Sequence, residues 1–266
     1  MSGDGSATSH ADSAVKGETP VLEIKNLTKQ FGGLRAVGDF SMSVMAGERR
    51  GILGPNGAGK TTVYNLVCGV YPVTSGSIWL NGKDITRLPI HDRVKLGLGR
   101  TFQVTNLFQE MTVLENVLLA AHVATGERHA YFKSVGSLKQ SNEKGLVELE
   151  KLGLKDAATH RVSELSYGQQ RQLEVALALA LAPTVLMLDE PTAGLSQVET
   201  DAMVQLIRRL PSSLAVVMIE HDLDVIFGVM EEMSVMHRGE LICDGDCDFV
   251  RSDPQVTEVY IGRERD

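Results

Sequence analysis

The residues with the clearest chemical meaning form a glycine-rich loop that ends in a lysine. The loop reads Gly54-Pro55-Asn56-Gly57-Ala58-Gly59-Lys60-Thr61 and follows the short apolar run Gly51-Ile52-Leu53. Glycines let backbone N–H groups turn toward phosphate oxygens, and the start of a following helix adds positive potential. We expect Lys60 to reach the β- and γ-phosphates of a nucleotide, Thr61 to ligate Mg²⁺ and Thr62 to contact an α-phosphate oxygen. The alternative, a glycine-rich turn with a chance lysine, is disfavoured by the strand and helix patterns on either side.

A pair of acidic residues follows a second apolar run. Asp189-Glu190 come directly after Val185-Leu186-Met187-Leu188, which is apolar at every position, as an interior parallel strand should be. Open α/β sheets bind ligands at the carboxyl ends of their strands. We expect Asp189 to hold Mg²⁺ through water and Glu190 to orient and polarise the attacking water of a phosphoryl transfer. The alternative role for Glu190 is to cap the turn at Pro191-Thr192.

A third polar segment, Leu165-Ser166-Tyr167-Gly168-Gln169-Gln170, precedes a helical pattern. It offers a hydroxyl, a glycine that permits close approach to the backbone, and the free N–H groups of a helix N-terminus, all of which suit an anion. Taken alone, Ser166, Gly168 and Gln169 could also form an ordinary helix cap. The helix that follows is predicted to end at Pro183.

The elements between these segments alternate between strand and helix. Residues 40–44 read Phe-Ser-Met-Ser-Val, an alternation with period two that predicts a half-buried strand. Met203 to Arg209 reads as a helix and Leu214 to Ile219 as a strand. This alternation predicts an α/β fold with a layered sheet.

A block of about sixty residues interrupts the alternation and is predicted to be an inserted helical lobe. Thr112 and Glu115 have the spacing of a capping box ahead of a helical apolar pattern. A second helical segment, Glu143 to Leu152, ends at Gly153. Residues 1–19, rich in Ser, Gly, Ala and Asp, read as a disordered tail, and residues 252–266 as a short helix with a charged tail.

Composition limits the classes of partner. The formal net charge of -8 and the pI of about 5.4 argue against nucleic acid. No apolar run reaches the 18 or more residues of a membrane-spanning helix, so we expect a chain that is soluble by itself. The three cysteines fit a reducing cytosol. Cys243 and Cys247 are the one pair with metal-site spacing, but ordinary reduced thiols are favoured because no further ligands lie nearby in the sequence.

The glycine-rich loop, the Leu-Ser-Tyr-Gly-Gln segment and the acid pair occur in the order that resembles the ATP-binding-cassette (ABC) ATPases. The resemblance implies a P-loop NTPase fold with a RecA-like core, an antiparallel β subdomain and an α-helical subdomain inserted at about residues 104–168, all within residues 20–266. It implies that ATP and Mg²⁺ are the ligands. It also implies that Ser166, Gly168 and Gln169 face the γ-phosphate held by an opposite subunit, so that two ATP molecules lie between two subunits.

Four further positions match motifs of that family. Gln103, in Gly99-Arg100-Thr101-Phe102-Gln103, resembles the Q-loop glutamine, whose amide touches Mg²⁺ and the attacking water. His221 resembles the switch histidine that reads the γ-phosphate. Phe31 resembles the aromatic residue that stacks on adenine, and Val37 would be a second apolar contact. Each of these, taken alone, has an ordinary structural alternative, a surface amide for Gln103 and a core or helix-flanking residue for the others.

Within the family, the chain resembles the ATPase subunits of branched-chain amino acid importers, a group that also serves urea and short amides. The residues that carry this likeness are Phe31-Gly32-Gly33-Leu34, Arg100 to Gln103, Met111 to Val117 and Val259-Tyr260-Ile261-Gly262. The likeness implies a peripheral subunit at the cytoplasmic face of the cell membrane. Its partners would be two permease subunits, a second ATPase subunit, either related or identical, and indirectly a solute-binding protein. The alternatives are a soluble ABC ATPase of repair or translation and a regulatory module that does not hydrolyse ATP.

Two positions depart from the family pattern. Ser196 stands in the D-loop where most ABC ATPases carry an aspartate, which puts the contact across the subunit interface in question. Arg49-Arg50, just ahead of the glycine-rich loop, are more basic than the usual apolar entry, and the sequence offers no reason for them.

Overall fold

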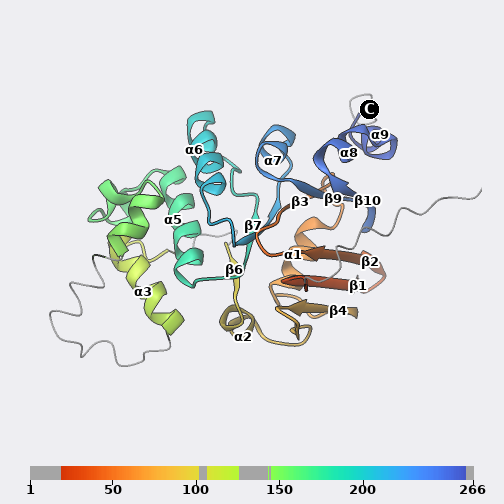
Figure 1. Ribbon diagram of the computed structural model, residues 1–266, viewed down its shortest axis with the longest axis horizontal. Coiled ribbons are helices and arrows are strands. Elements are labelled where there is room, and N and C mark those ends of the chain that lie inside the picture. The colour runs from red at the N-terminus through yellow and green to blue at the C-terminus, as the bar shows by residue number, and fades with distance from the viewer. Residues whose placement is uncertain (1–18, 102–106, 126–142, 144, 262–266) are drawn as a thin grey trace, which may run out of the picture.

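Within the described part of the chain, the strands form two sheets (Figure 1). The computed structural model describes residues 19–101, 107–125, 143 and 145–261. The strands are β1 (Leu22–Phe31), β2 (Leu34–Val44), β3 (Arg49–Leu53), β4 (Ser75–Leu80), β5 (Lys83–Asp84), β6 (Leu98–Arg100), β7 (Val185–Asp189), β8 (Ala215–Ile219), β9 (Glu232–His237) and β10 (Glu240–Asp246). The larger sheet has the order β10-β9-β3-β8-β7-β6 and is parallel except for β10, and the smaller sheet, β2-β1-β4-β5, is antiparallel.

Helices cover the larger sheet and extend the fold on one side. They are α1 (Lys60–Val67), α2 (Ile90–Lys95), α3 (Val113–Thr125), α5 (Tyr167–Ala180), α6 (Gln197–Arg208), α7 (Leu223–Val229), α8 (Cys247–Ser252) and α9 (Pro254–Ile261), and residues 145–151 are also helical. In Figure 1, α3 and α5 lie beyond the β6 end of the larger sheet, whereas α8 and α9 lie at the β10 end. None of the helices in the described part of the chain is long and apolar enough to span a membrane.

The strand β7 shows why its sequence is apolar at every position. Val185 and Met187 belong to a core cluster that includes α1 and the smaller sheet. Leu186 and Leu188, on the opposite face, belong to a second cluster with α5, α6 and α7. Burial on both faces confirms the predicted interior strand and the α/β fold class. It also fixes the position of Asp189 at the end of the strand.

The described helical residues of the predicted lobe share a hydrophobic cluster with α5. Leu107, Val117, Leu149 and Leu173 lie in a third cluster, which joins α3, the helical residues 145–151 and α5. The predicted capping box is present, because the backbone N–H of Thr112 donates to Glu115 Oε2 at 2.7 Å and that of Glu115 donates to the Thr112 hydroxyl at 3.2 Å. The second helical segment ends before Gly153, whose φ of 73° is the left-handed conformation expected there.

The structure explains the two basic residues at the start of β3. Arg49 is 9% exposed, and its guanidinium donates to the carbonyls of Ile207 (3.1 Å) and Leu210 (2.9 Å) at the end of α6. Ile207 also accepts the N–H of Leu210 at 3.2 Å, and Leu210 lies just after the helix, so Arg49 adds donors at the C-terminal end of α6 and caps it. Arg50 donates to Glu48 at 2.5 Å and Asp244 at 2.6 Å. Both residues are therefore structural.

The other expected elements are largely present. The strand predicted at residues 40–44 is the second half of β2, and the helix expected from Met203 is part of α6, which begins earlier, at Gln197. The short helix expected near the end of the chain is α9. The predicted disordered tail falls on residues 1–19, of which residues 1–18 lie outside the described residues.

Candidate nucleotide site

The carboxyl ends of the parallel strands meet at one edge of the larger sheet and supply the polar groups of the site. β3 leads into the loop that begins at Gly54, β7 ends at Asp189, β8 precedes Glu220 and His221, and β9 leads to Arg238. Their order in the sheet places β3 between β9 and β8, with β7 next to β8. Residues far apart in the sequence are therefore gathered around the glycine-rich loop, as open α/β sheets gather the groups of their ligand sites.

The glycine-rich loop wraps around the ammonium group of Lys60. Gly59 has a φ of 104°, and a Cβ at this position would lie 2.7 Å from the Ala36 carbonyl oxygen, so only glycine fits. The side chain of Lys60 is 5% exposed, and its Nζ donates to the carbonyls of Gly54 (2.5 Å) and Pro55 (3.2 Å). The cation is thus held at the mouth of a loop whose N–H groups precede a helix, an arrangement that suits a polyphosphate.

A cavity of about 590 Å³ opens beside this loop. Its walls come from the turn between β1 and β2, the loop, the start of α1 and the end of β9. The lining residues are Phe31, Leu34, Arg35, Ala36, the residues 56–62, Glu190 and Arg238. The predicted phosphate-binding residues Lys60, Thr61 and Thr62 are therefore brought together in one cavity with Glu190.

The predicted adenine contacts differ in their placement. Phe31 is 42% exposed, lines the cavity and meets the ring of Tyr71 edge to face at 5.4 Å. Lys29 Nζ lies over the Phe31 ring, 4.7 Å from its centroid. A partly exposed aromatic ring beside a phosphate cradle suits a base stacked on its other face. Val37, in contrast, is fully buried in the core on β2, and its neighbour Ala36 lines the cavity instead. The geometry does not support Val37 as a contact of the base, because strand alternation turns its side chain to the opposite face.

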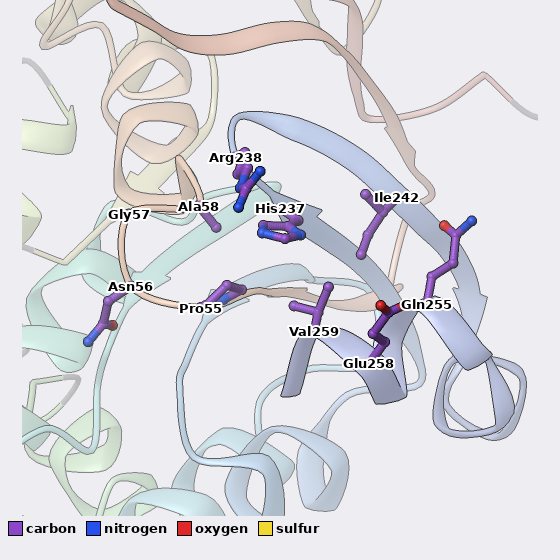
Figure 2. A pocket seen from close by; sticks show the side chains of 10 residues that line it. All are labelled: Pro55, Asn56, Gly57, Ala58, His237, Arg238, Ile242, Gln255, Glu258 and Val259. Atoms are coloured by element: carbon purple, nitrogen blue, oxygen red, sulfur yellow. The ribbon is translucent and has the colours of Figure 1, made fainter. Parts of the chain in front are cut away.

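Arg238 is a cavity residue that the sequence reasoning missed. It lies in the β9–β10 turn with a φ of 49° and lines the nucleotide cavity together with a second cavity of about 650 Å³ on the other side of the loop. Figure 2 shows this second cavity, with His237 and Arg238 on one side and Glu258 and Val259 of α9 on another. The Arg-Gly pair of a hairpin turn was the only signal in the sequence, and a turn by itself does not indicate a ligand.

The acid pair splits into one buried and one accessible carboxylate. Asp189 is 5% exposed, whereas the Glu190 side chain is 37% exposed. Glu190 has a φ of 47°, an uncommon left-handed conformation for a residue with a side chain, and its N–H donates to the Ile219 carbonyl at 2.9 Å. Such strain concentrates at functional sites. The backbone thereby directs Asp189 into the fold and Glu190 toward the cavity.

His221 lies next to Glu190 and is anchored by a buried glutamate. His221 Nδ1 lies 3.7 Å from Glu190 Oε1 and 3.5 Å from Glu220 Oε2. Glu220 is fully buried; it accepts the N–H of His221 at 3.1 Å, the N–H of Thr192 at 3.1 Å and the hydroxyl of Thr192. Glu220 therefore ties the segment after Glu190 to His221. The sequence showed Glu220 only as one acid beside the histidine.

The Leu-Ser-Tyr-Gly-Gln segment forms the start of α5. The Ser166 hydroxyl accepts the N–H of Gln169 at 3.2 Å, and the Gln169 side chain accepts the N–H of Ser166 at 3.0 Å, which is a capping box. Gly168 N–H donates to Glu199 Oε1 at 3.1 Å. Hydrogen bonds from Ser196 and Gly168 lower the pKa of Glu199, the backbone N–H of Ser196 having the largest effect. The sequence reasoning missed Glu199.

Two remaining predictions concern Gln103 and the cysteines. Gln103 lies outside the described residues, so its role stays a prediction. Cys243 is buried, and burial raises the pKa of its thiol to about 11. Cys247 donates its thiol to the Met230 carbonyl at 3.1 Å, and burial raises its pKa as well. Burial therefore favours the neutral thiol at both positions.

Known proteins share both the sequence and the fold. Residues 37–193 match the ABC transporter family. A similar relative is the high-affinity branched-chain amino acid transport ATP-binding protein BraF of Pseudomonas aeruginosa, 39% identical over 250 residues, with 91% of this chain and 98% of BraF covered.

Solved structures agree with this likeness. The ADP conformation of MJ1267, an ATP-binding cassette of an ABC transporter, is 32% identical with a TM-score of 0.79, and 92% of this chain and 99% of MJ1267 are covered. The dimeric structure of MJ0796, a bacterial ABC transporter cassette, is 26% identical with a TM-score of 0.71, covering 85% of this chain and 98% of MJ0796. The chain belongs to the ABC transporter family and is an ATP-binding cassette that hydrolyses ATP.

Proposed function

We propose that this chain is the ATPase subunit of an importer for branched-chain amino acids. The observation that carries the hydrolytic part is the approach of Glu190 and His221 (3.7 Å) beside the cavity that Lys60 and Phe31 share. The solute is supported by the 39% identity to BraF over nearly the whole length of both chains. Because the permease and the binding protein select the solute, no residue of this site identifies it.

ATP binding uses groups that already face the cavity. The adenine stacks on Phe31, and the triphosphate enters the loop between Gly54 and Thr61. Lys60 Nζ, which lies 2.5 Å from the Gly54 carbonyl, exchanges its carbonyl partners for the β- and γ-phosphate oxygens. With a phosphate oxygen both partners are charged, which makes the hydrogen bond from the ammonium stronger than one to a neutral carbonyl and favours this exchange.

The donor set beside the loop fits Mg²⁺. Asp189 offers a carboxylate at the end of β7, and Thr61 offers a hydroxyl at the start of α1. Magnesium is usually bound through one or two carboxylates together with substrate phosphates and water. The described residues contain no cluster of three or more His, Cys, Asp or Glu residues that would favour a metal held by protein groups alone. When bound, Mg²⁺ neutralises the charge that develops on the phosphates.

Glu190 and His221 act on the γ-phosphate end. Phosphoryl transfer requires a positioned nucleophile and a stabilised charge more than covalent chemistry. Glu190 accepts a hydrogen bond from the attacking water and places it in line with the γ-phosphate. His221, held through Glu220, contacts the γ-phosphate. Gln103, three residues after the end of β6 in the sequence, would complete the arrangement.

The site is completed by a second ATPase subunit. Among the described residues, Ser166, Gly168 and Gln169 do not line the cavity of their own chain. A second subunit in a face-to-face pair would bring its own copies of these residues to the γ-phosphate, and the solved MJ0796 cassette shows a dimer in this family. To invert a 1:99 population of closed and open pairs, ATP needs about 5.5 kcal/mol of differential affinity.

The remaining partners are two permease subunits at the cytoplasmic face of the membrane, to which a binding protein delivers the solute. An apolar groove of about 330 Å³ lies between α3 and α5, and Leu107, Phe108, Leu119 and Leu177 are among its lining residues. Arg100, at the end of β6, lines the groove as well. We assign this groove to a cytoplasmic segment of the permease, since such a segment would contact both the lobe and the chain that leads to Gln103.

Two measurements test the proposal. Glu190→Gln should keep ATP affinity and abolish turnover, and undiminished turnover would remove Glu190 from catalysis. Proteoliposomes with this chain, a second ATPase subunit, two permease subunits and a binding protein of the same transporter should accumulate leucine when ATP is inside. Accumulation of urea or a short amide, with no transport of leucine, would contradict the assigned solute.

A further inference from the structure

Glu199 forms a bridge between two segments that both face a partner subunit in the proposed dimer. Its Oε2 accepts the N–H of Ser196 at 3.0 Å and the Ser196 hydroxyl at 2.8 Å. Its Oε1 accepts the hydroxyl of Ser166 at 3.2 Å and the N–H of Gly168 at 3.1 Å. One carboxylate thus takes four hydrogen bonds, two from the D-loop and two from the start of α5.

Capping of α6 explains only half of these contacts. Glu199 is the third residue of α6 and forms a capping box with Ser196 through Oε2. Oε1 serves no such purpose, because its donors belong to α5, more than thirty residues earlier in the chain. The approach is close enough that a Cβ at position 168 would lie 2.5 Å from Oε1. Gly168 therefore gives Glu199 access to the backbone of α5.

The donors that hold Oε1 are those that the proposed function assigns to ATP. A hydroxyl and a backbone N–H at a helix N-terminus favour an anion, and in the isolated chain this anion is a carboxylate of the same chain. A γ-phosphate from a partner subunit cannot receive the same hydrogen bonds while Oε1 occupies them. The two anions also repel each other, so both are not accommodated in one place.

The same contact explains why a serine at position 196 is favourable. A serine hydroxyl donates to the Glu199 carboxylate, whereas an aspartate at this position would set a second negative charge against it. Serine in place of the usual D-loop aspartate is therefore compatible with the hydrogen bonds between Glu199 and α5, whereas aspartate would repel the Glu199 carboxylate.

We propose that Glu199 is an internal placeholder for the γ-phosphate, which occupies the Ser166 and Gly168 donors in the open subunit and is displaced when the ATP of a partner subunit arrives. This inference rests on the composite site of the proposed function. Since Oε2 holds Ser196, displacement of the carboxylate also loosens the D-loop at the moment of closure. Glu199 is a positioning residue that opposes dimerisation until ATP is present on the partner.

The test measures pairing that depends on ATP in the Glu190→Gln background, which blocks turnover. The ATP concentration for half-maximal dimer is determined by analytical ultracentrifugation, with this chain alone and with its sibling subunit. Glu199→Ala should lower that concentration by about fivefold, because the carboxylate no longer competes with the phosphate for the Ser166 and Gly168 donors. Glu199→Gln, which keeps an acceptor oxygen but loses the charge, should give a smaller decrease.

Two control variants separate displacement from other effects. Glu115→Ala removes the same capping interaction from α3. Asp201→Asn removes a negative charge from α6 at a side chain that bonds to Gln197. Both should leave the half-maximal concentration unchanged, and binding of ATP to the isolated subunit should be equal in all variants. Melting temperatures confirm that each variant is folded.

The outcomes distinguish this inference from the function on which it rests. A parent that pairs, together with a Glu199→Ala variant that pairs equally or less well, would overturn the placeholder and leave a purely structural cap. An equal gain in Asp201→Asn would overturn it in favour of general charge repulsion. A Glu190→Gln parent that stays monomeric at saturating ATP, alone and with its sibling, would refute the composite site and the placeholder together.

Discussion

The hydrogen bonds of the buried Glu220 carboxylate predict how much stability a substitution of one of its partners removes. Glu220 is 0% exposed and takes three hydrogen bonds, two from Thr192 and one from His221. Thr192→Val keeps the shape and the backbone N–H at position 192 but removes the hydroxyl. A hydrogen bond to a buried charged group contributes about 1.5–3 kcal/mol. We therefore expect the free energy of unfolding to fall by about 2 kcal/mol.

For a chain of this size, that loss corresponds to a melting temperature lowered by about 4–8 °C. ATP turnover should fall as well, because Glu220 then holds His221 less firmly. Thermal scans and urea titrations measure stability, and phosphate release measures turnover. Thr200→Val, on α6, is the matched control and should change neither quantity. Equal melting temperatures for Thr192→Val and the parent would refute the idea that the carboxylate depends on this hydroxyl.

Three further predictions test other parts of the structure. Phe31→Ala should weaken ATP binding about tenfold, since stacking of a base on an aromatic ring contributes roughly 1–3 kcal/mol. Val37→Ala should leave ATP affinity unchanged. A nucleotide titration in which Val37→Ala weakens binding and Phe31→Ala does not would show that Val37, and not Phe31, contacts the base. Arg49→Met should lower the free energy of unfolding by about 2 kcal/mol, because it removes the guanidinium bonds to the buried carbonyls of Ile207 and Leu210, of which Ile207 keeps the N–H of Leu210 as a donor. Arg35→Met, at an exposed ion pair with Glu240, should cost less than 1 kcal/mol, and equal costs in urea would contradict the cap. Burial raises the pKa of the Cys68 thiol from 9.0 to about 12. The neutral thiol therefore adds its full stability below pH 9, and this contribution is lost as the pH rises to 12. The free energy of unfolding of Cys68→Ala should fall less steeply with pH in that range, by up to about 1.4 kcal/mol per pH unit, and parallel curves for variant and parent would contradict the raised pKa.

The sequence predicted those parts of the fold that depend on local patterns. The uninterrupted apolar run of β7, the Thr112–Glu115 cap and the glycine at the end of the 145–151 helix all appear where they were expected. In each, neighbouring residues supply the physical cause. The glycine-rich loop could also be predicted from local sequence, because the spacing of its glycines specifies a turn before a helix.

The residues that the sequence did not reveal act through distant partners. Arg49 meets carbonyls more than 150 residues away, and Glu220 meets Thr192. Glu199 contacts Gly168 only because α5 and α6 pack together. Arg238 enters the cavity because β9 lies beside β3. The resemblance that suggested Val37 as a second apolar contact does not say which face of β2 its side chain occupies, and the structure places it in the core.

A complementation experiment tests the shared site most directly. Lys60→Ala subunits keep the Ser166 segment but lose the phosphate cradle, whereas Ser166→Arg subunits have the opposite defect. Each variant alone should be inactive. When the two are mixed in conditions where the parent is active without its sibling subunit, one complete site forms in each mixed pair, and ATP turnover should return to a measurable fraction of the parent's. A mixture as inactive as its components would show that each chain builds its catalytic site alone.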